Sequence, residues 1–219
     1  WAIDDIEVTG VQPLFAEDFE SVELGPNVDE GTAGDEVWTK EGPDGWTIND
    51  EGVPGVGTNE DGVTEWAGWS FADLEWWNAT AGDQQRSQFL AANGGLGSGA
   101  ALIADPDEWD DSAHAASGQL PENGGAQSYD TFITSPEFSI AELEGEAVIL
   151  TFDSSWRDED RQTATITANF DTGDSLTVLR WESVGGANFK DDTPNEQVQI
   201  AIPVPAEAEA MSLTFALID

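Results

Sequence analysis

The stretch that decides the fold is Thr163-Ala-Thr-Ile-Thr-Ala-Asn-Phe170, followed by Asp171-Thr-Gly-Asp174 and Ser175-Leu-Thr-Val-Leu-Arg-Trp181. Polar and apolar side chains alternate in the first run, which is typical of a strand with one face in water and the other in a core. The four residues after it have the composition of a tight turn. Residues 162–182 therefore predict a β-hairpin.

Similar short runs of Val, Ile, Leu and Phe, separated by Gly, Pro, Asn and Asp, recur along the chain. Helix signals are weak, and only residues 139–146 and the region around Asp73–Trp77 are expected to form a short helical turn. Residues 25–65 are rich in Gly, Pro, Asp and Glu and predict long acidic loops. The chain is therefore expected to be all-β, with strands near 1–8, 129–138, 146–153, 162–170, 175–182, 196–203 and 210–217.

Composition limits the partners. The chain has 219 residues, enough for one sizeable β-domain, with 45 acidic and 6 basic residues and a formal net charge of −39. Such a field excludes nucleic acids and anionic membranes as partners, and no apolar run is long enough for membrane insertion. Ten Trp and ten Phe argue against disorder. Screening of this charge by salt or divalent cations indicates an extracellular or cell-surface protein of marine or halophilic origin.

The sequence begins inside one expected strand, Trp1–Val8, and ends inside another, Met211–Asp219. Unpaired strand edges invite pairing with another chain. Residues 1–10 are therefore expected to be a donated or exchanged strand plus a joint, and residues 11–219 a single β-sandwich domain. The strand would insert beside the last strand of a neighbouring copy, head to tail, so that a filament forms. The residues expected to carry this exchange are Trp1, Ile3, Ile6, Val8, Leu213, Phe215 and Leu217.

Several motifs resemble a known family. Glu17-Asp18-Phe19-Glu20 and Trp1-Ala-Ile-Asp-Asp-Ile6 resemble the opening and closing strands of MAM-like jelly-roll domains. Three further runs resemble the domain attached to marine bacterial secreted phosphoesterases and large repetitive surface proteins. The resemblance covers roughly residues 15–219 and implies a jelly-roll β-sandwich, but no enzyme. Its closing strand comes first in this chain, so the strand order is circularly shifted. The three runs are Trp76-Trp-Asn-Ala-Thr-Ala-Gly-Asp-Gln-Gln-Arg-Ser87, Ala104-Asp-Pro-Asp-Glu108 and Phe152-Asp-Ser-Ser-Trp-Arg157.

Closely spaced carboxylates indicate calcium, because this ion takes six to eight oxygen ligands. The resemblance implies a cation between the opening and closing strands, with Asp5, Asp18 and Glu20 as ligands. A second dense acidic run contains Asp105, Asp107 and Asp110. The alternative is that these are solvated acids in a chain full of them. Because the chain has no Cys, it cannot form disulfide bonds, and bound Ca²⁺ would stabilise the fold in their place.

The Trp residues suggest a second kind of site. Trp69, Trp76 and Trp77 could belong to a platform that stacks on sugar rings, with a polysaccharide as partner. A core role for these rings is the favoured alternative. The neighbours Trp76 and Trp77 could not both face inward on a strand, because adjacent side chains of a strand point to opposite faces.

Signals for catalysis are poor. The chain has one His, His114, no Cys and no G-x-S-x-G elbow, so no enzymatic activity is expected. The favoured interpretation is an extracellular structural module, a calcium-stabilised β-sandwich repeat of a surface fibre, filament or adhesin. The alternative is an accessory carbohydrate-binding module of a secreted hydrolase.

Overall fold

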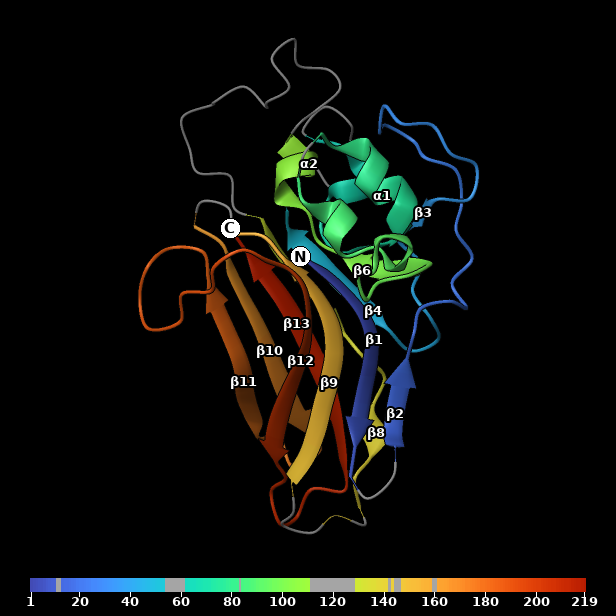
Figure 1. The fold of residues 1–219 in the computed structure, drawn as a ribbon. Coiled ribbons are helices and arrows are strands. Elements are labelled where there is room, and N and C mark those ends of the chain that lie inside the picture. The colour runs from blue at the N-terminus through green and yellow to red at the C-terminus, as the bar shows by residue number, and fades with distance from the viewer. Residues whose placement is uncertain are drawn as a thin grey trace.

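The computed structural model describes residues 1–10, 13–53, 62–82, 84–110, 129–141, 143, 147–158 and 161–219. The chain is mostly β and forms two antiparallel sheets that pack as a sandwich (Figure 1). One sheet has seven strands in the order β12-β9-β1-β6-β5-β3, with β2 also beside β1. The other has six, in the order β11-β10-β13-β7-β4, with β8 beside β13. The expected β-sandwich class is thus confirmed at this level.

The strands are β1 Ala2–Thr9, β2 Pro13–Glu17, β3 Trp38–Thr39, β4 Thr47–Gly52, β5 Ser70–Asp73, β6 Ala100–Ile103, β7 Asp130–Thr134, β8 Phe138–Ser139, β9 Ala147–Trp156, β10 Thr163–Phe170, β11 Ser175–Glu182, β12 Thr193–Pro203 and β13 Ala210–Ile218. The α-helices are α1 Leu74–Thr80 and α2 Pro106–Asp110, and the 3₁₀ turns are η1 Thr64–Trp66, η2 Arg86–Gln88 and η3 Ala91–Asn93. Among the helices of the described ranges, none has the length and apolar character needed to cross a bilayer.

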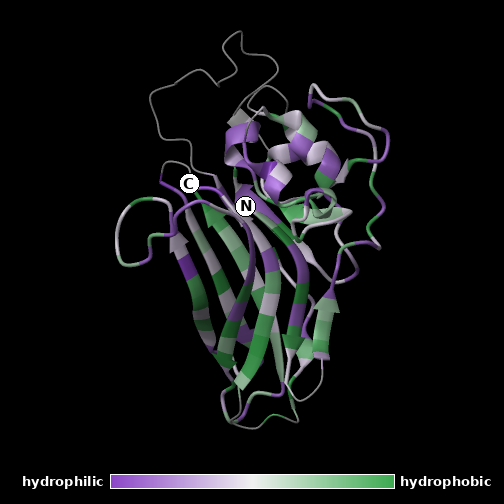
Figure 2. Ribbon diagram, in the orientation of Figure 1, coloured by the Kyte–Doolittle hydropathy of each residue, from purple (hydrophilic) through white to green (hydrophobic). Residues whose placement is uncertain are grey.

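The hairpin predicted from residues 162–182 is confirmed as β10 and β11. On β10 the even-numbered side chains from Ala164 to Phe170 are buried, while the alternating Thr side chains face outward. The same alternation gives several strands their hydrophilic and hydrophobic bands in Figure 2. The core therefore lies between the two sheets, and side-chain alternation decides which residues enter it.

The predicted partner of the first strand is wrong. β1 lies in the seven-stranded sheet, where it pairs with β9 on one side and with β6 and then β2 on the other. The last strand, β13, lies in the other sheet between β10 and β7. Residues 1–10 complete the sheet of their own chain, and the expected joint is the turn of the β1–β2 hairpin, where Thr9 lies opposite Pro13. No place beside β13 is left for a donated strand, because both of its edges are occupied.

The residues expected to carry strand exchange instead build the chain's own core. Ile3, Ile6 and Val8 are buried from the seven-stranded sheet, and Leu213, Phe215 and Leu217 are buried from the other. Trp1 lies between the sheets, with its ring centroid 5.6 Å from that of Trp69, 5.7 Å from Trp181 and 6.4 Å from Phe215. The first strand is thus joined to the rest of the fold by core packing as well as by backbone pairing.

Candidate metal centre at the bulge of the first strand

The first candidate site lies where β1 changes partners. Ala2 and Ile3 pair with β6, whereas Ile6 and the residues after it pair with β2. On the other edge Asp4 lies opposite Asp153 and Glu7 opposite Thr151, so β1 has one residue more than β9. This is a β-bulge, a device that redirects side chains at a strand edge. Asp5 lines a hollow there together with Asp18 and Asp153, whereas Asp4 is buried.

Asp4 and Asp5 differ in exposure. Asp4 is only 1 % exposed, and its carboxylate accepts backbone hydrogen bonds from Asp5 N at 2.9 Å and from Ser98 N at 3.0 Å. Asp5 is exposed, and its backbone has a φ of 49°, a left-handed conformation that is uncommon outside Gly. The bulge therefore buries the side chain of Asp4 and leaves that of its neighbour Asp5 exposed.

The second side of the site comes from the segment after β2. Asp18 accepts a hydrogen bond from Glu20 N at 3.1 Å, and Phe19 between them also has a positive φ, 58°. Because Phe19 is fully buried while Asp18 and Glu20 are exposed, the turn directs both carboxylates outward. Glu20 lies against Gly99, where an added Cβ would fall 2.0 Å from Glu20 Oε1. A side chain at position 99 would therefore push Glu20 away from the site.

The electrostatics show that these carboxylates repel one another. Burial, with the charges of Asp5 and Glu20, raises the pKa of Asp4 to about 7. Burial and the neighbouring charge of Asp18 raise the pKa of Asp5, and the same causes raise the pKa of Glu20 despite the opposing Ala100 amide. Asp153, opposite Asp4, also has a raised pKa because of burial and Asp5. A bound cation would offset this repulsion.

Carboxylates offer oxygen ligands, the kind that calcium prefers. Within the described residues, however, no three acidic side chains lie close enough together to hold a metal ion as they stand. The structure thus brings together the expected Asp5, Asp18 and Glu20 as neighbours that interact electrostatically. Sequence reasoning missed Asp4 and Asp153, although Asp4 stands next to a residue that was chosen.

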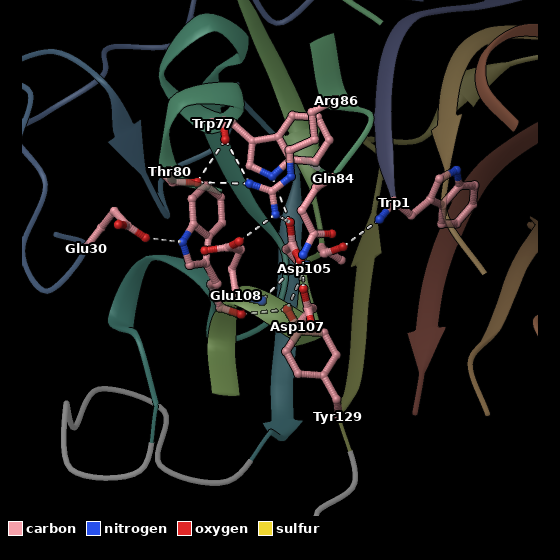
Figure 3. Close-up of polar contacts among 12 residues, drawn as sticks. Trp1, Glu30, Trp77, Thr80, Gln84, Arg86, Asp105, Asp107, Glu108 and Tyr129 are labelled. Atoms are coloured by element: carbon pink, nitrogen blue, oxygen red, sulfur yellow. Dashed lines mark hydrogen bonds and ion pairs between the residues drawn. The ribbon is translucent and has the colours of Figure 1, made fainter. Parts of the chain in front are cut away.

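The second predicted acidic site has a different chemistry. Asp105 is buried, and its Oδ2 accepts hydrogen bonds from Arg86 at 2.6 Å and from the indole of Trp77 at 2.8 Å (Figure 3). Glu108 binds the same guanidinium at 3.0 Å. Burial disfavours the charge of Asp105, but Arg86 and the Trp77 hydrogen bond outweigh it and leave the pKa lowered. Arg86 thus takes the place of the expected cation, which corrects the prediction for Asp105.

The other members of that run are placed differently. Asp107 accepts a hydrogen bond from the side-chain amide of Gln84. The side chain of Asp110, like the whole of His114, lies outside the described residues. Among the residues that the structure describes, no group of metal ligands lies around Asp105 and Asp107.

The core role favoured for the Trp residues is confirmed and the possible sugar-stacking platform is not formed, because Trp69, Trp76 and Trp77 are 0, 6 and 4 % exposed. The expected short turn near Asp73–Trp77 is in fact helix α1, whose first turn is capped by Asp73 accepting from Trp76 N at 2.8 Å. On a helix two adjacent side chains lie about 100° apart, so both can be buried. Trp76 stacks on Trp66, and Trp77 lies under the guanidinium of Arg86.

Comparisons with models of protein families, with curated proteins and with solved structures found no match for this chain.

Proposed function

We propose that the chain is a calcium-stabilised β-sandwich module, of jelly-roll type, with a structural role in an extracellular protein. The observation that carries this proposal is the meeting of Asp4 and Asp5 from the β1 bulge with Asp18 and Glu20 from the segment after β2. These groups come from two segments that must lie together for the sheet to be complete. A cation between them would join the first strand to the rest of the sheet.

The charge of the chain supports an extracellular setting. At −39 the folded protein repels itself, and calcium and salt outside the cell would reduce that repulsion. Exposed Asp5, Asp18 and Glu20 leave the site open to cations from solvent. Assembly through donation of the first strand is not part of the proposal, since β1 completes its own sheet. Nor is sugar stacking on Trp69, Trp76 and Trp77, since these rings are buried.

Calcium titration of the chelator-treated protein tests the proposal. Extracellular calcium modules bind with Kd values of about 10⁻⁴–10⁻³ M. At about 100 times the Kd a ligand stabilises the folded state by about 2.7 kcal/mol. In a domain of this size that raises Tm by about 5–10 °C. Differential scanning calorimetry at a series of calcium concentrations measures this shift, and isothermal titration calorimetry measures the Kd.

Two double variants are compared. Asp18→Asn/Glu20→Gln removes two negative charges at the candidate site, and Glu207→Gln/Glu209→Gln removes two at an exposed turn away from it. The first pair should lose most of the calcium-dependent rise in Tm, and the second should keep it. Equal responses in both pairs would mean that calcium acts only by general screening. In that case the proposed centre would be wrong.

A further inference from the structure

A second site, separate from the acidic centre, lies beside the Arg86 cluster at the end of the sandwich that carries the helices (Figures 1 and 3). Several parts of the chain meet there, among them the end of β9, the residue before β10, the start of α2 and the loop after α1. These four contribute Ser155, Gln162, Asp107 and Gln84 to the lining of one pocket, which Trp1 and Trp77 also line. We propose that this pocket binds a neutral, hydroxyl-rich ligand, such as a sugar residue of a polysaccharide.

Two largely buried side chains present polar groups to this pocket. Ser155 is 7 % exposed and Gln162 is 4 % exposed, and both line the pocket. Within the part of the chain that the structure describes, neither the Ser155 hydroxyl nor the Gln162 side-chain amide takes part in a hydrogen bond. Their polar atoms are not among the fully buried atoms that lack a partner, so solvent reaches them from the pocket. A ligand that accepts and donates hydrogen bonds would take the place of that water.

The walls of the pocket are already held in place. The backbone of Gln162 is fixed by hydrogen bonds in both directions with Ser183, at 2.7 and 3.0 Å. Arg86 is held by Asp105 and by the Trp77 carbonyl at 2.8 Å, and its guanidinium carbon lies 4.5 Å from the Trp77 ring centre. A ligand would meet these side chains in their final positions, which reduces the entropy lost on binding.

The charges and shape of the pocket indicate the class of ligand. Arg86 and Arg157 line it together with Asp105 and Asp107, so positive and negative groups are equal in number. The surrounding charge of −39 disfavours an anion, and the two arginines disfavour a cation. The Trp77 indole also lines the pocket, but it is 4 % exposed and lies under the Arg86 guanidinium, so recognition would rest on hydrogen bonds. The pocket has room for about one water-sized group. One hydroxyl or hydroxymethyl group of a sugar would therefore enter it, while the sugar ring would stay outside the pocket.

The test uses the whole chain and four probes: D-glucose, D-galactose, N-acetyl-D-glucosamine and D-glucuronate. Saturation-transfer NMR detects contact with the protein, and Trp fluorescence gives the Kd. We expect at least one neutral sugar to bind with a Kd of about 1–10 mM, and glucuronate to bind more weakly than that sugar. The proposal is overturned if no neutral sugar binds at about 100 mM, a result that would leave water as the occupant. It is also overturned if glucuronate binds best.

The variants Ser155→Val and Gln162→Leu assign the binding to the pocket. Each removes one hydrogen-bonding group, and Ser155→Val also adds a methyl group at the small pocket, so each should weaken sugar binding at least about tenfold. The controls Ser175→Val and Gln199→Leu make the same changes at exposed strand positions and should leave it unchanged. Binding that is equally strong in all four variants would place the sugar elsewhere and refute the proposal. Calcium-dependent Tm should be the same in all of them, so this test is separate from that of the metal centre.

Discussion

Lowering the pH from 8 to 5 should stabilise the calcium-free protein. The reason is Asp4, which is buried and whose pKa rises from 3.8 to about 7 on folding. At pH 8 the folded chain must keep this buried carboxylate charged, and that disfavours folding. As the pH falls through 7 the folded state takes up a proton that the unfolded chain does not yet bind, so stability rises until the pH approaches 4. Asp5, Glu20 and Asp153 also have raised pKa values and add to the effect in the same direction.

The size of this effect follows from the Asp4 shift alone. Each pH unit between the two pKa values changes the free energy of unfolding by about 1.4 kcal/mol, so pH 8 to pH 5 gives about 2.7 kcal/mol. In a domain of this size that is a rise in Tm of about 5–10 °C. Urea unfolding at each pH, with chelator present, measures it. Added calcium should flatten the pH dependence, because the cation favours the charged carboxylates. A chelated protein that is less stable at pH 5 than at pH 8 would refute the reasoning.

Three further changes test other parts of the structure. Arg86→Met should lower the free energy of unfolding by about 3–5 kcal/mol, because it leaves two buried carboxylates without their cationic partner. Arg180→Met removes an ion pair at the surface and should lower it by at most about 1 kcal/mol. Urea unfolding of the two variants measures the difference. Gly99→Ala should lower the Tm and weaken the calcium response, because the added Cβ would meet the Glu20 carboxylate and because the backbone φ of residue 99 is +58°. The control Gly185→Ala, whose Cβ would meet nothing within 4 Å, should change neither the Tm nor the calcium response. Raising salt from about 0.01 to 1 M in chelator should increase the Tm, because the Debye length falls from about 30 to 3 Å; a flat or falling Tm would contradict a fold limited by self-repulsion.

The strands could be predicted because alternation is a local property. β10 and β11 follow from side-chain alternation and one turn, and the structure confirms them. The neighbours of β1 could not be predicted in this way, since alternation decides which face is buried and says nothing about which strand lies beside it. The spacing of Ile3 and Ile6 was a usable signal. In a regular strand these two side chains would face opposite sides, so their shared burial requires the bulge that shapes the acidic site.

The sequence left the platform and the core role of the Trp residues open, because a short helical turn around Asp73–Trp77 does not decide which way each ring faces. Asp73, an N-cap residue before Leu74, was the local signal for a helix, and the helix allows Trp76 and Trp77 to be buried together. The pocket beside Arg86 had no signal in the sequence. Ser155 and Gln162 are ordinary residue types, and only the fold brings their polar groups to one pocket.

The two acidic runs show why carboxylate spacing alone does not identify a metal site. Asp18 and Glu20 belong to one dense run and Asp105 to another, and the sequence gives both the same interpretation. The difference comes from a residue elsewhere in the chain, because folding brings Arg86 within 2.6 Å of Asp105 and no basic group is among the influences on Asp5 or Glu20. One cluster is neutralised by a side chain, and the other keeps its repulsion. In a chain with 45 acidic and 6 basic residues, the clusters without a basic neighbour are therefore the ones where a cation gives the largest stabilisation.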